Sequence, residues 1–126
     1  MAADAYLKVA AGQLQQAATD VKRQADQIRS EAASFKQKAE GDIVSKTAEV
    51  KVLQMEMDRR RDEPGVVSHL NIQIQNMQRD IDSLKQEIVQ RTSQADQAVR
   101  GKEGAMQGLQ SQSQQLAQQA GDPALR

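Results

Sequence analysis

The chain has 126 residues, of which 2% are aromatic and none is cysteine, and it carries 17 basic and 17 acidic residues. This composition excludes a thick globular core, disulfides, thiolate catalysis and zinc sites built from cysteine. The balanced charge provides no long-range attraction to nucleic acid or to an anionic membrane, so we expect neither as a partner.

The sequence predicts neither a membrane span nor a classical secretory signal. No apolar run approaches the roughly 18 residues that a membrane span requires. The first residues, Met1 to Asp4, have neither the basic nor the apolar region of a secretory signal. We therefore expect a cytoplasmic protein, with export by a route that needs no signal as the alternative.

Residues 4–61 carry a regular apolar pattern. Apolar or small residues recur at alternating steps of three and four, which predicts a long helix with one buried seam. Larger side chains hold one set of seam positions and alanine holds much of the other. Two consecutive steps of four at Phe35, Ala39 and Ile43 shift the phase of the pattern. The seam positions are Leu7, Ala11, Leu14, Ala18, Val21, Ala25, Ile28, Ala32, Phe35, Ala39, Ile43, Lys46, Val50, Leu53 and Met57.

A turn is predicted over residues 62–66. Glu63 precedes a proline and so avoids the helical region, Pro64 cannot continue the preceding helix, and Gly65 permits unusual dihedral angles. We expect Asp62 or Ser68 to be the N-cap of the next helix, the choice depending on whether Pro64 is its first residue.

A second helix is predicted over residues 67–120, followed by a frayed C-terminus at 121–126. Its consecutive steps of four fall at Leu84, Ile88 and Thr92. The seam positions are Val67, Leu70, Ile74, Met77, Ile81, Leu84, Ile88, Thr92, Ala95, Val99, Lys102, Met106, Leu109, Ser113, Leu116 and Ala120.

The two patterns together predict the fold class. If the chain reverses once, residues whose numbers sum to about 124 lie level, so Ile43 faces Ile81 and the two phase shifts coincide. We therefore predict an all-α protein in which residues 1–126 form a single domain. Its two long antiparallel helices form a coiled-coil hairpin that can dimerise into a four-helix bundle.

The polar residues show no pattern typical of an active site. His69 has no serine, cysteine or acidic residue at a spacing that would orient it as a base. The carboxylates are scattered singly among basic residues, and Gly101, Gly104 and Gly108 do not follow a strand as a phosphate-binding loop would. We expect no catalytic residue, no metal and no cofactor, and hence no enzyme.

The densest charge lies next to the predicted turn, where Arg59, Arg60 and Arg61 are flanked by acidic residues. These arginines could bind a phosphate or an acidic surface. The alternative is that they stabilise the C-terminal end of the first helix through its dipole.

Several apolar or small residues lie outside the seam and are candidates for contact with another helix. They predict a non-enzymatic structural or interaction protein that forms a homodimer or docks onto another helical protein. The alternative is a small helical hairpin that is exported or displayed on a cell or virion surface. The candidates are Val44, Ala48, Val52, Met55, Ile72, Val89, Ala98, Gly101, Ala105 and Gly108.

Overall fold

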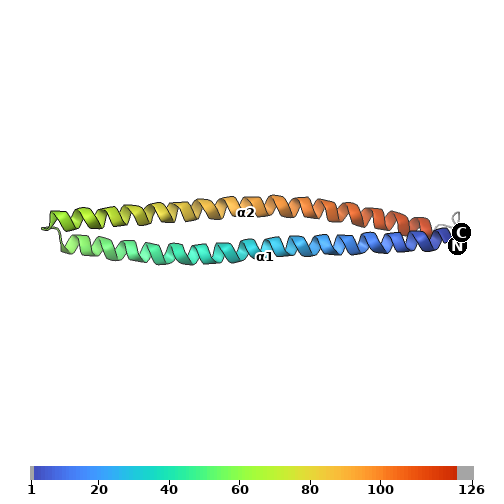
Figure 1. Ribbon diagram of the computed structural model, residues 1–126, viewed down its shortest axis with the longest axis horizontal. Coiled ribbons are helices and arrows are strands. Elements are labelled where there is room, and N and C mark those ends of the chain that lie inside the picture. The colour runs from blue at the N-terminus through green and yellow to red at the C-terminus, as the bar shows by residue number, and fades with distance from the viewer. Residues whose placement is uncertain (1, 122–126) are drawn as a thin grey trace. The chain divides into compact units, whose positions relative to one another are not determined.

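The computed structural model describes residues 2–121, with the side chains of 4–120. Two α-helices, α1 (Ala2–Arg59) and α2 (Pro64–Gly121), account for nearly all of this range, which contains no strand (Figure 1). The helices pack against each other as a helical hairpin, which confirms the predicted all-α fold class. Of the predicted frayed segment, Gly121 ends α2 and residues 122–126 lie outside the described residues.

The chain divides into two compact units. The terminal unit combines residues 1–31 with 94–126, and the turn unit comprises residues 32–93. Within each unit, a stretch of α1 runs alongside an antiparallel stretch of α2 (Figure 1).

The turn between the helices comprises residues 60–63, so both helix boundaries there differ from the predicted ones. The Glu63 N–H donates to the Arg60 carbonyl at 2.9 Å and closes the turn, which ends α1 at Arg59 rather than at residue 61. Pro64 is the first residue of α2, three residues earlier than predicted. A proline suits that position because its fixed φ is helical and its missing N–H would have had no helical partner.

The predicted N-caps and the predicted role of Gly65 are consequently wrong. Glu63 directly precedes α2, and its carbonyl accepts the Val67 N–H at 3.0 Å, so neither Asp62 nor Ser68 is the N-cap. Gly65 lies inside the first turn of α2, and none of the described glycines has a positive φ. The pre-proline residue, not the glycine, breaks the helical backbone.

In the terminal unit, the predicted seam of α1 is the buried side of the helix. Ala11, Ala18 and Ala25 are buried, and the larger Leu7 and Leu14 on either side of them are half-buried. Small side chains at the centre allow the two backbones to approach closely, which leaves part of each larger neighbour uncovered. The core is consequently thin.

Two polar residues of α2 also occupy predicted seam positions in the terminal unit. The buried Ser113 hydroxyl donates to the Ala11 carbonyl at 2.8 Å, and the half-buried Lys102 donates to the Gln24 side chain at 2.9 Å. Buried polar groups need such partners. Each bond joins α1 to α2 and favours one alignment of the helices.

The turn unit contains the apolar core cluster. Val50, Ile74 and Ile81 are buried, and Ile43 packs against them together with Leu53, Met57 and Met77. The predicted proximity of Ile43 to Ile81 is therefore confirmed, and with it the single reversal of the chain.

One predicted seam residue of the turn unit is wrong. Thr92 is exposed, and its neighbour Arg91 instead places its guanidinium 4.0 Å from the centroid of the Phe35 ring. A planar cation can cover an aromatic face that the short threonine side chain cannot reach. Because Thr92 defined the phase shift in α2, the predicted coincidence of the two shifts is not supported.

Candidate interaction surfaces

A row of exposed apolar residues runs along α1 in the turn unit. Val44, Val52 and Met55 are 69%, 62% and 61% exposed, and Ala48 is exposed between them. At 100° per residue, the four lie within an arc of about 80° on the side of α1 that faces away from the seam. We call these four residues the outer row.

The two candidates on α2 do not extend the outer row. Ile72 and Val89 are 55% and 68% exposed but lie seventeen residues apart on the other helix. Isolated exposed apolar residues are normal on protein surfaces. The structure therefore groups the candidates of α1 and leaves those of α2 separate.

An open groove of about 430 Å³ lies beside the outer row, between α1 and α2. Val52 belongs to both the row and the groove, and Leu53 and Met77 complete the apolar part of the lining. The polar lining residues are Glu49, Gln73 and Asn76. The apolar periodicity predicted the seam but not this groove. The groove is lined by side chains of both helices, and the spacing of residues within one helix does not show how they meet.

The four small candidates of the terminal unit form a stripe on α2. Ala98, Gly101, Ala105 and Gly108 are all exposed and follow steps of three and four, which place them on one side of the helix. A Cβ atom added at Gly101 or Gly108 would meet nothing within 4 Å. The stripe is accessible, and its predicted role in binding stays a prediction.

Two exposed residues of the terminal unit did not emerge from the sequence pattern. Tyr6 and Val9 on α1 are 74% and 59% exposed. Both lie outside the steps of three and four, so the apolar pattern that revealed the seam could not reveal them.

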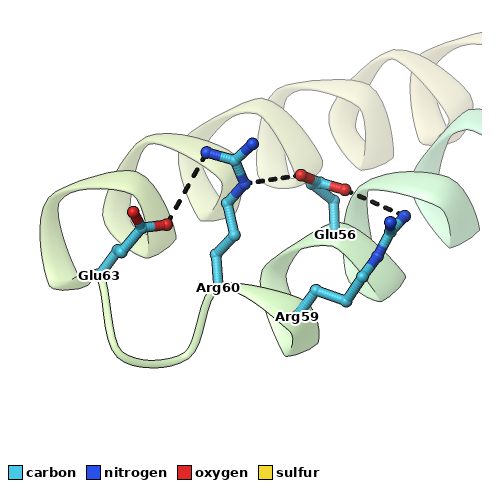
Figure 2. A network of polar contacts seen from close by, with 4 residues as sticks. All are labelled: Glu56, Arg59, Arg60 and Glu63. Atoms are coloured by element: carbon cyan, nitrogen blue, oxygen red, sulfur yellow. Dashed lines mark hydrogen bonds and ion pairs between the residues drawn. The ribbon is translucent and has the colours of Figure 1, made fainter.

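The arginines at the turn have intramolecular partners (Figure 2). Glu56 accepts from Arg60 at 2.7 Å and from Arg59 at 3.1 Å, and Arg60 lies 3.7 Å from Glu63 across the turn. Arg61 donates to the Asp58 carbonyl at 3.2 Å. This network, which we call the turn network, gives Arg59 and Arg60 a structural role that requires no ligand.

The described residues contain no cluster of side chains that could hold a metal ion. His69 lies 3.3 Å from the Gln73 amide nitrogen, on the exposed surface. No three His, Asp or Glu side chains between residues 2 and 121 converge as a metal site would require. Neither helix of this range is long and apolar enough to cross a membrane.

Comparison with known proteins provides no relative for this chain. No protein-family model matches it, and searches of curated proteins and of solved structures give no significant similarity.

Proposed function

We propose that the chain is a non-enzymatic protein-interaction module, a coiled-coil hairpin that associates with itself or docks onto a helical partner. The observation that carries this proposal is the outer row. Three large apolar side chains, each more than half exposed, follow one side of a single helix in the turn unit. Helix-in-groove and helix-bundle contacts use anchors with this spacing.

The thin core of the hairpin supports the same proposal. Among the described residues, the buried apolar ones are five alanines, two valines, two isoleucines and one leucine, and no large side chain is fully buried. A second helix packed on the outer row would remove apolar surface from water that the hairpin alone leaves exposed. Within the turn unit, the seam then serves to pack α1 on α2 and to present the row.

The test compares two double variants, each of which replaces two exposed apolar residues with glutamine. Val44→Gln with Met55→Gln removes the ends of the outer row, whereas Ile72→Gln with Val89→Gln removes the isolated residues of α2. Glutamine preserves helix propensity, so both variants should fold. Light scattering from micromolar to near-millimolar protein measures self-association, and a photocrosslinking amino acid at Ala48 in the native cell captures a partner.

We expect the outer-row variant to weaken association or crosslinking about tenfold, and the α2 variant to leave both unchanged. A chain that is monomeric throughout and forms no crosslink at Ala48 would contradict the proposal. Equal effects of the two variants would also contradict it, because they would indicate non-specific apolar contact.

A further inference from the structure

The groove beside the outer row has an acidic border. On α1, Asp42, Glu49 and Glu56 recur every seven residues, so they lie in line on one side of the helix. On α2, Asp80 and Glu87 continue the line of Gln73 at the same interval. Glu49 and Gln73 both line the groove, so the two acidic lines start at its two sides and continue along the helices beyond it.

Three of these carboxylates form no ion pair with a basic side chain of the described residues. Glu56 is paired within the turn network, and Glu87 is paired with Arg91 at 3.1 Å. Asp42, Glu49 and Asp80 are exposed and form no ion pair or side-chain hydrogen bond within the described part of the chain. Lys46, half-buried in the seam, forms no ion pair with them either.

Another groove of the turn unit has a different charge. It lies on the other side of the hairpin, because Thr47 in its lining is two residues, or about 200°, from Glu49 around α1. Its lining contains one acid, Asp82, and one base, Lys85. The groove beside the outer row is therefore lined by one acid and no base, whereas this groove is lined by one acid and one base.

We infer that this groove, with the outer row, binds a basic amphipathic helix of a partner protein. The inference rests on the proposed function and specifies the partner. Apolar side chains of that helix would contact Val52, Leu53 and Met77, and its lysines or arginines would lie against Asp42, Glu49 and Asp80. Complementary charge at the edge of an interface speeds encounter and excludes wrong partners.

Charge also distinguishes this partner from a second copy of the chain. A symmetric dimer contact uses the same patch on both subunits. Two copies joined at this groove would place each acidic border against the other, and like charges in an interface are unfavourable. Nucleic acid and anionic membranes would be repelled for the same reason.

The probe is a synthetic helix of about 18 residues, or five turns, with leucine at steps of three and four and lysine on both flanks of the leucine face. A second peptide carries glutamate in place of every lysine. Binding to the full chain is measured by fluorescence anisotropy of the labelled peptide, at low and at physiological salt.

Two charge-reversal variants of equal net charge locate the site. Glu49→Lys with Asp80→Lys reverses the border of the groove, and Asp58→Lys with Asp82→Lys makes the same change on the opposite side. Asp58 lies eleven residues, or three turns, from Thr47 and therefore on the same side of α1. All four side chains are exposed and unpaired, so both variants should fold, which circular dichroism checks. The milder pair Glu49→Gln with Asp80→Asn should give an intermediate loss.

We expect the lysine peptide to bind the native chain, the groove variant to weaken binding at least about tenfold, and the opposite-side variant to change it less than about threefold. Equal losses in both variants, or equal binding of the glutamate peptide, would overturn the inference. So would a native dimer that the groove variant alone dissociates, because a second copy would then occupy the groove. If the inference fails but the proposed function holds, Val44→Gln with Met55→Gln still weakens association or crosslinking, since neither residue lines the groove.

Discussion

The Arg91 guanidinium covers the ring of Phe35, the one phenylalanine of the chain. Arg91 also pairs with Glu87 on its own helix at 3.1 Å, which holds the guanidinium in place. A charged residue of α2 thus contacts the seam of α1. The exposed side of the guanidinium stays hydrated.

A double-mutant cycle with Arg91→Ala and Phe35→Leu tests this contact. We expect a coupling free energy of about 0.5–1 kcal/mol, as for exposed cation–π pairs. Urea unfolding of the four proteins measures it. Additive effects would contradict the contact. As a control, Glu87→Gln should change the free energy of unfolding by less than about 0.5 kcal/mol, because the pair is exposed.

Individual seam residues could be predicted wherever an apolar or small residue continued the steps of three and four. Even Lys46 and Ser113 were placed correctly, because the pattern depends on position as well as residue type. Thr92 was wrong because periodicity selected the less polar of two adjacent residues. The contact of Arg91 depends on its side-chain geometry, which spacing does not encode.

At the scale of elements, Glu63 and Pro64 determine where the chain turns. Gly65 belongs to the first turn of α2 and has no special backbone conformation. Proline at the first helical position and a non-helical Glu63 suffice to reverse the chain. The sequence located the turn to within a few residues. Its boundaries could not be predicted because a proline both ends one helix and favours the start of the next.

Gly65→Ala tests this account of the turn. Since Gly65 has a helical backbone and open space around it, alanine should raise the free energy of unfolding by about 0.5–1 kcal/mol. Thermal unfolding measures the change, and Gly41→Ala in the middle of α1 should have a similar effect. A loss of stability at residue 65 alone would show that the turn requires glycine.

Glu56→Gln tests the turn network. Replacing the carboxylate removes the ion pairs with Arg59 and Arg60, and we expect a loss of about 0.5–1 kcal/mol that shrinks in high salt. Glu49→Gln is the matched control, because Glu49 is on the same side of α1 and has no ion pair. If both variants lose equal stability, the network does not stabilise the turn.

At the scale of the whole molecule, the sequence predicted the helical hairpin and the residues of the outer row, but not how they group. The regular spacing of Val44, Ala48, Val52 and Met55 was visible in the sequence. Nothing in that spacing distinguished the row from Ile72 and Val89, because separation in space follows from the fold. The seven-residue spacing of Asp42, Glu49 and Glu56 was also visible, but their ion pairs require coordinates.

The functional proposals depend on the chain reversing at residues 60–63 and packing α1 on α2 within one molecule. Spin labels at Thr47→Cys and Gln78→Cys test this directly, since the native chain lacks cysteine and both positions line one groove. The sample is diluted with unlabelled chain, so that only distances within one molecule contribute to the pulsed dipolar signal.

The account predicts a single distance below about 25 Å, because packed helix axes are about 8–10 Å apart and the label arms add the remainder. One continuous helix through residues 47–78 would instead give about 46 Å. A distance near that value, or a signal that disappears on dilution, would contradict the hairpin and the surfaces built on it.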